Sequence, residues 1–153
     1  MKLQQYRAAG GVLVDNDRRV LVIEREVWRS GECLHEVRLP KGHVEASETD
    51  AEAALREVCE ETGYCGITIE ADLGEAVTEF TWDDRQVHRT EHYYLMHVVD
   101  PTPGTPHFDS PTAEEARFHP RWIANLADAE RELTYESERA FLRRALSAIN
   151  NER

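Results

Sequence analysis

The stretch from Gly42 to Tyr64, with the sequence GHVEASETDAEAALREVCEETGY, constrains the fold of this chain more than any other stretch does. Thr49 followed three residues later by Glu52 is a capping box, and Gly63 supplies the left-handed residue that ends many helices. An apolar stripe at helical spacing is formed by Ala51, Ala54, Leu55 and Val58. The stretch therefore predicts a helix over about residues 50–62 that packs one face on a core.

Three glutamates of this helix, Glu57, Glu60 and Glu61, share an adjacent face because they are spaced i, i+3 and i+4. In an acidic chain such a face is often simply solvated. Here, however, like charges lie four residues apart, and two of the acids fall in the last turn, where the helix dipole favours cations. Each effect costs about 0.3 to 1 kcal/mol. A hard divalent cation such as Mg²⁺ would relieve both costs through oxygen ligands, so the pattern favours a metal site on the helix.

The composition bounds the class of protein. With 153 residues, of which 41% are hydrophobic, the chain suits one domain spanning residues 1–153. A formal net charge of −12 argues against a nucleic-acid partner. The first residues lack an apolar signal core and no run reaches membrane-spanning length, so we expect no membrane partner and a cytoplasmic location. Three cysteines without a CxxC pair fit a reducing compartment and argue against a disulfide framework and a zinc–cysteine site.

The residues before the helix predict a hairpin. Two β-branched and apolar runs, residues 6–14 and 20–23, flank the turn-forming sequence Asp15-Asn16-Asp17. Gly10 and Gly11 interrupt the first run, which indicates a bulge or a close approach of another backbone.

Further strands are expected on both sides of the helix. A polar loop over residues 28–32 precedes a strand over residues 34–39, which leads into a tight turn at Pro40-Lys41-Gly42. Beyond the helix, residues 67–80 and 87–99 are rich in strand-forming residues.

The last third of the chain predicts a loop, a short strand and a helix. Prolines recur between residues 101 and 111 and exclude regular structure there, with a plain connector favoured over a substrate-side lid. Residues 116–123 are a short strand candidate, and Thr134 can cap a final helix over about residues 134–150. The pattern as a whole is that of an α+β fold with a mixed β-sheet, one helix in the middle and one at the end.

The central stretch resembles the signature of the Nudix hydrolases. That signature is a glycine, five residues, a glutamate, seven residues, an Arg-Glu pair, an aliphatic residue, any residue, a Glu-Glu pair, any residue, a glycine and an aliphatic residue. Its places are filled by Gly42, Glu48, Arg56, Glu57, Val58, Glu60, Glu61 and Gly63. Tyr64 departs from the pattern because it is aromatic. The strand order around the motif also resembles the αβα sandwich of this family, so the resemblance extends over the whole chain.

The resemblance implies a hydrolase that cleaves diphosphate bonds in nucleoside diphosphates linked to another group, with Mg²⁺ or Mn²⁺ as cofactor. The implied metal ligands are Glu57, Glu60, Glu61 and the carbonyl of Gly42. Arg56 would orient the glutamates, although it could also pair with Glu52 on the helix surface. Glu48 would be an accessory group near the metal or simply an acid at the start of the helix.

A carboxylate must accept the proton of the attacking water. The family varies in which residue serves, so the assignment stays open between Glu57, as first choice, and Glu115 or Glu114 in the loop before Arg117 and Phe118. For the loop acids, solvation is the competing interpretation.

The sequence Leu-Pro-Lys-Gly-His at residues 39–43 is similar to a branch of the family that cleaves dinucleoside polyphosphates and diphosphoinositol phosphates. There Lys41 would contact a phosphate of the substrate, and His43 would either donate to phosphate or stabilise the turn. The continuation at residues 45–48 departs from the Pro-Gly turn that is usual in this branch.

A nucleotide substrate also needs a stacking partner for its base. Tyr94, Tyr93 and Trp82 are candidates, against the alternative that they belong to the core. The remaining histidines show no metal-ligand spacing and are interpreted as structural: His35, His88, His92, His97, His107 and His119.

Three hypotheses of function follow. The leading one is a metal-dependent pyrophosphohydrolase of a nucleotide-linked diphosphate, a small-molecule substrate. The second is a catalytically inactive Nudix-like module that senses nucleotide or metal, and the third is a generic binding domain whose acidic helix is only solvated. Family members are often homodimers, and the sequence leaves that state open because it shows no apolar seam.

Overall fold

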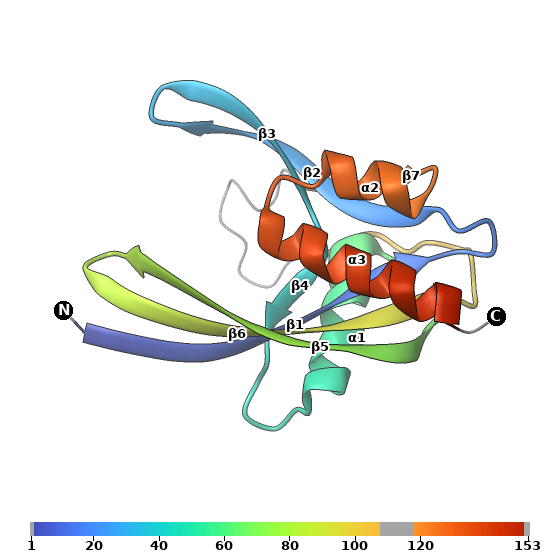
Figure 1. Cartoon of the computed structure of the whole chain (residues 1–153), viewed down its shortest axis with the longest axis horizontal. Coiled ribbons are helices and arrows are strands. Elements are labelled where there is room, and N and C mark those ends of the chain that lie inside the picture. Colours follow the sequence, from blue (N-terminus) through green and yellow to red (C-terminus); the bar gives the residue numbers. More distant parts are fainter. Residues whose placement is uncertain (1, 108–117, 152–153) are drawn as a thin grey trace.

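A computed structural model of the chain describes residues 2–107 and 118–151. Within them a mixed sheet of seven strands forms the centre of the molecule (Figure 1). The strands are β1 (Lys2–Val14), β2 (Val20–Arg29), β3 (Glu32–Arg38), β4 (Lys41–His43), β5 (Ile67–Trp82), β6 (Arg85–Val98) and β7 (His119–Ile123). The order is β3-β2-β1-β6-β5, with β4 paired to β1 and β7 paired to β2. β1 and β6 run parallel and the other pairs antiparallel, which confirms the mixed sheet.

Helices cover both faces of this sheet. α1 (Asp50–Thr62) lies on one face, and α2 (Leu126–Glu132) and α3 (Glu136–Asn151) lie on the other (Figure 1). Each face has its own apolar cluster, because successive residues of a strand point to opposite faces. On β6, Tyr93 packs in the α3 cluster and Tyr94 in the α1 cluster. The three layers confirm the α+β class and the αβα sandwich.

The hydrogen bonds and the backbone conformation at the two ends of α1 are those that the sequence predicts. The Thr49 hydroxyl accepts a hydrogen bond from the Glu52 amide at 3.1 Å, and the Glu52 carboxylate accepts one from the Thr49 amide at 3.0 Å. Gly63 has a φ of 82° and ends the helix in the left-handed conformation. Both caps and the bounds of the helix are therefore confirmed.

The end of α1 is held by residues that follow it in the chain. The Glu60 carbonyl accepts a hydrogen bond from the His107 amide, and the Gly63 carbonyl accepts one from the Gly104 amide, each at 2.6 Å. These bonds tie the segment over residues 101–107, which has no regular structure as expected, to the last turn of the helix. Pro111 lies outside the described residues.

A disulfide joins Cys59 in the last turn of α1 to Cys65. The expectation that the chain carries no disulfide is therefore wrong. The left-handed residue Gly63 reverses the chain just after the helix and brings the two Cα atoms within 4.4 Å, which is a separation that a disulfide can bridge. Cys33, on β3, is exposed and free.

Two predicted connections before α1 are strands instead. Residues 28–32 do not form a loop, because β2 continues to Arg29 and only Ser30 and Gly31 turn, both with positive φ. Residues 41–43 form β4 rather than a tight turn. A Cβ on Gly10 would lie 2.3 Å from the Pro40 carbonyl oxygen, which confirms the close backbone approach predicted there.

The C-terminal part also differs from the prediction. α2 was not expected, because its seven residues are too few to show a helical period. α3 begins at Glu136, and the Thr134 hydroxyl does not cap it but accepts a hydrogen bond from the Val37 amide at 2.8 Å. Thr134 therefore fastens the start of α3 to β3. Among the described residues, no helix combines the length and apolar character needed to cross a membrane.

Candidate active site

β4 brings Gly42 against the side chain of Glu57 on α1. A Cβ atom on Gly42 would lie 2.1 Å from the Glu57 carboxylate carbon and 2.2 Å from one of its oxygens. Only a glycine leaves room for a carboxylate at this place. The pairing of β4 with β1 fixes the position, because Gly42 lies opposite Ala9 in the register.

Arg56 is the centre of the polar contacts around Glu57. Its guanidinium donates two hydrogen bonds to Glu48, at 2.6 and 2.8 Å, and one to Glu57 at 2.8 Å. It also donates to the His43 carbonyl at 3.0 Å and reaches Glu60 at 3.4 Å. The hydrogen bonds from Arg56 lower the pKa of the Glu48 carboxyl group. The arginine therefore binds the start of the motif, β4 and the helix acids together.

Glu52, by contrast, is engaged in the N-terminal cap of α1 through its bond to the Thr49 amide. The surface pair of Arg56 with Glu52 is not among the contacts of the arginine, which uses the carboxylates of Glu48, Glu57 and Glu60.

Glu61 completes the acidic group from the next turn of the helix. Its carboxylate accepts a hydrogen bond from the Lys41 amide at 2.8 Å, so it also lies against β4. Glu57 and Glu61 thus lie against β4, Glu60 is linked to Glu57 through Arg56, and all three offer carboxylate oxygens. Mg²⁺ takes one or two carboxylates and fills its other positions with water and phosphate, so this donor set and the glycine cradle fit such an ion.

A cleft opens on the α3 face of the sheet, whereas α1 and its glutamates lie on the other face. It has a volume of about 310 Å³ and is formed by residues of β3, β5, β6 and the start of α3. Its lining consists of Arg38, Thr78, Phe80, Arg89, Tyr135, Ser137 and Glu138. Two arginines and two aromatic rings therefore face one pocket.

The ammonium group of Lys41 interacts electrostatically with residues that line this cleft. Burial lowers the pKa of the Lys41 ammonium group, and the charges of Arg38 and Arg89 lower it further. Glu138 and Glu91 act in the opposite direction. Arg38 and Arg89 thus share this region with the carboxylates of Glu138 and Glu91, and the lowered pKa reduces the positive charge that Lys41 adds.

The two arginines of the cleft differ in their contacts. Arg38 is held by Glu138, to which its Nε donates at 2.6 Å. Arg89 is held less firmly, since it lies 3.5 Å from the Glu91 carboxylate. Among the buried side-chain nitrogens and oxygens of the described residues, Arg89 Nε is the one without a hydrogen-bond partner. A buried donor left unsatisfied is costly, and Arg89 is therefore the less firmly held of the two arginines that line the cleft.

The aromatic candidates from the sequence lie in different places. Tyr93 is fully buried, with its ring 4.5 Å from that of Phe141. Tyr94 is 7% exposed and stacks on His92 at 4.4 Å. Both rings belong to the core, whereas Trp82 is exposed at the end of β5.

Sequence reasoning missed Arg38, Phe80, Arg89 and Tyr135 as cleft residues. A signal existed for one of them, because Arg89 and Glu91 place charges two residues apart on one face of the strand that leads into the apolar run of β6. Such charges on a central strand indicate a buried polar site. His43, for which the sequence left open a phosphate contact or stabilisation of the turn, packs its ring 4.3 Å from that of Tyr6. Glu114 and Glu115 lie outside the described residues.

Comparisons with known proteins agree with this architecture. A protein-family model described as the NUDIX domain matches residues 5–144 of this chain. A protein of Mycobacterium tuberculosis (strain CDC 1551 / Oshkosh), named MutT4 and provisionally described as a mutator protein, is 41% identical over 104 residues. The match covers 65% of this chain but only 41% of that protein, so the chain spans less than half the length of this relative.

Solved structures share the fold. The structure of a binary complex of an Ap4A hydrolase from Caenorhabditis elegans has a TM-score of 0.64 at 21% identity, covering 97% of this chain and 99% of that one. A Nudix hydrolase from Nitrosomonas europaea has a TM-score of 0.61 at 17% identity, covering 95% and 90% of the two chains. The fold and the motif define a Nudix-type domain. With the family model matched over most of its length, the chain belongs to the Nudix family.

Proposed function

We propose that this protein is a divalent-metal-dependent pyrophosphohydrolase that cleaves a diphosphate bond in a nucleotide-linked substrate. The observation that supports this most is the position of the Glu57 carboxylate in the space above Gly42, where Arg56 donates a hydrogen bond to it. An acidic metal site alone would fit many proteins. The chain also has a cleft lined by Arg38 and Arg89, and arginines can hold the phosphates of a substrate while one of them reacts.

Each residue of the site has a proposed part. Glu57, Glu60, Glu61 and the Gly42 carbonyl would hold Mg²⁺ or Mn²⁺, which when bound lowers the pKa of water and draws charge from the phosphate oxygens. Arg56 and Glu48 keep the carboxylates in place through their mutual hydrogen bonds.

A carboxylate of the chain must take the proton of the attacking water. Glu57 is our first choice because its carboxylate lies against β4, in the space above Gly42. Glu115 remains the second. The two assignments predict different pH profiles for the Gln variants, because only loss of the true base removes the acidic limb of the kcat profile.

The cleft suggests how the substrate binds. Lys41, Arg38 and Arg89 would contact its phosphates, and charge-assisted hydrogen bonds of this type are the stronger ones. Tyr135, which is 42% exposed, and Phe80 offer ring faces on which a base can stack. The similarity to an Ap4A hydrolase, together with the Leu-Pro-Lys-Gly-His sequence, favours a dinucleoside polyphosphate over a mononucleotide.

The test is a panel of dinucleoside polyphosphates, nucleoside triphosphates and nucleoside diphosphate sugars, incubated with and without Mg²⁺ and with product identification. Reaction in ¹⁸O-labelled water identifies the phosphorus that is attacked. Magnesium-dependent release of two nucleotides from a dinucleoside polyphosphate is the expected result. Tight nucleotide binding without any product would instead support the inactive sensor module.

A further inference from the structure

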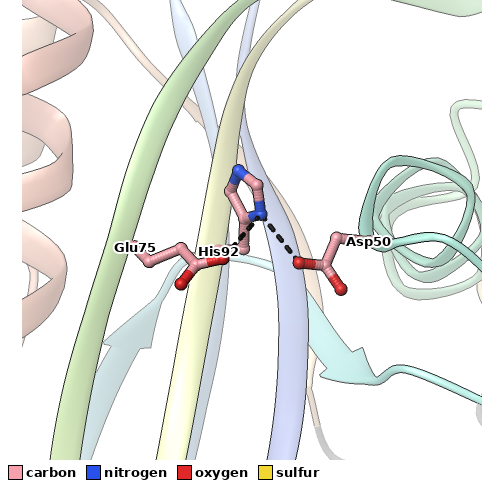
Figure 2. Close-up of side chains that lie close together, drawn as sticks. All are labelled: Asp50, Glu75 and His92. Atoms are coloured by element: carbon pink, nitrogen blue, oxygen red, sulfur yellow. Dashed lines mark hydrogen bonds and ion pairs between the residues drawn. The ribbon is translucent and has the colours of Figure 1, made fainter.

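A second group of ligand-type side chains lies at the opposite end of α1 from Glu61. Asp50 comes from the first turn of α1, Glu75 from β5 and His92 from β6, and their ligand atoms all lie within 4.8 Å of one another (Figure 2). His92 Nδ1 is 2.8 Å from an Asp50 oxygen and 3.6 Å from a Glu75 oxygen. Three successive elements of the chain thus bring side chains to one ring nitrogen.

The other nitrogen of the same ring meets a fourth residue. His92 Nε2 lies 2.7 Å from a carboxylate oxygen of Asp72. Histidines that bind metals usually donate their second N–H to a carboxylate, which fixes the ring and makes the free nitrogen a better ligand. Asp72 is the carboxylate that contacts Nε2 of His92. The other ring nitrogen, Nδ1, faces Asp50 and Glu75.

Arg7 supplies the positive charge that these acids share in the structure. It forms an ion pair with Asp50 and another with Glu75, the latter at 2.5 Å. Its side chain is 44% exposed, whereas that of His92 is only 12% exposed. In the structure both ring nitrogens of His92 lie within hydrogen-bond distance of a carboxylate, so the ring carries both protons. A cation bound at Nδ1 would replace one of these protons, and three carboxylates with Arg7 then leave two negative charges, which one divalent cation would balance.

We infer that Asp50, Glu75 and His92 form a binding site for a divalent transition-metal ion of the Zn²⁺ type, with Asp72 orienting the imidazole. An imidazole nitrogen with carboxylate oxygens suits zinc, whereas magnesium prefers oxygen ligands alone. The inference is independent of the proposed enzymatic function. Asp50 and Glu57 are seven residues apart, about 10 Å along a helix, so the two sites are distinct.

The site has a structural consequence. It would fasten the first turn of α1 to β5 and β6, where Arg7 of β1 already bridges Asp50 to Glu75 of β5 through ion pairs. A metal bound only by the folded chain raises its stability, so zinc should raise the melting temperature.

The test uses full-length protein, freed of metal by chelation, in which Glu57, Glu60 and Glu61 are all replaced by Gln so that the proposed active-site ligands are removed. Calorimetric titration with Zn²⁺ should then give one equivalent bound, and titration with Mg²⁺ should give none. Cobalt added in place of zinc should show visible absorption bands of a coordinated ion. Absence of any zinc binding in this variant would overturn the inference.

Two further variants in the same background locate the ion. His92→Ala should abolish binding, and Asp72→Asn should weaken it by about 10- to 100-fold. His97→Ala is the matched control, because His97 is on the same strand but contacts Asn16 at 2.7 Å. Should His92→Ala lower the melting temperature of the metal-free protein, His92→Gln is used instead. Equal zinc affinity with and without His92 would mean that the ion binds elsewhere.

Discussion

The carboxylate carbon of Glu57 lies 2.1 Å from the position that a Cβ on Gly42 would occupy. The side chain of Glu57 on α1 thus occupies the space that a side chain at position 42 of β4 would need. Only a glycine there leaves room for the carboxylate. This contact explains why the glycine that begins the motif and the glutamate of its Arg-Glu pair act together. It also defines the first test of the site.

Replacing Gly42 with Ala should displace the Glu57 carboxylate and lower turnover by about 100-fold, since a shift of about 1 Å can cost that much. Steady-state rates on the substrate found in the panel measure the effect. Gly31→Asn is the control, because nothing lies within 4 Å of a Cβ at Gly31 and Asn tolerates its positive φ. A Gly42→Ala protein with the rate of the wild type would remove Glu57 from the site.

Replacing Glu57 or Glu60 with Gln should lower turnover by orders of magnitude, because the amide keeps the shape but removes a charge that the metal requires. The melting temperature in chelator should change little, since each change also reduces the repulsion between acids on α1. Rates and melting curves are compared with those of Glu26→Gln, an exposed change on β2. Normal rates in both variants would show that other residues hold the metal.

Replacing Arg89 with Ala should raise KM about 10- to 100-fold with a smaller effect on kcat, because a charge-assisted hydrogen bond is worth about 1.5 to 3 kcal/mol. The prediction depends on the unpaired Nε of Arg89 in the cleft. Arg143→Ala, on the outer side of α3, removes the same charge where it pairs with Glu130 and Glu136. Equal KM values for the two variants would argue against phosphate binding by Arg89.

Acid should destabilise the fold through Glu36. Burial alone would raise the pKa of its carboxyl group, but hydrogen bonds from Tyr135 and Arg25 together lower it below the usual value. The resulting stabilisation is fully present above the unfolded pKa of about 4.3 and is lost as the pH falls through the lower folded pKa. Because Glu36 and Arg25 are both buried, Glu36→Gln should cost about 3 to 5 kcal/mol at pH 7.

Melting curves from pH 7 to pH 3 test this expectation. The difference between wild type and Glu36→Gln should shrink as the pH falls, while Glu79→Gln, an exposed change on β5, should follow the wild type throughout. A difference that stays constant down to pH 3 would mean that the ionised form of Glu36 contributes nothing.

The sequence predicted the local structure of α1 well, because this depends on residues that are close in the chain. The capping box, the left-handed Gly63 and the spacing of Glu57, Glu60 and Glu61 all act within a few turns of one helix. The same reasoning failed at β4 and at the disulfide. Both depend on which residues a reversal of the chain brings together in space. Local sequence patterns do not specify that geometry.

By itself, then, the sequence determined the helix of residues 50–62, its acidic face and the α+β class, since periodicity and caps are local properties. Only the tertiary structure decided which residues share a site. The parallel pairing of β1 with β6 brings Arg89 to the α3 face beside Lys41, and it brings His92 to the α1 face beside Asp50. Contacts between residues about fifty positions apart follow from strand register, and no local pattern specifies that register.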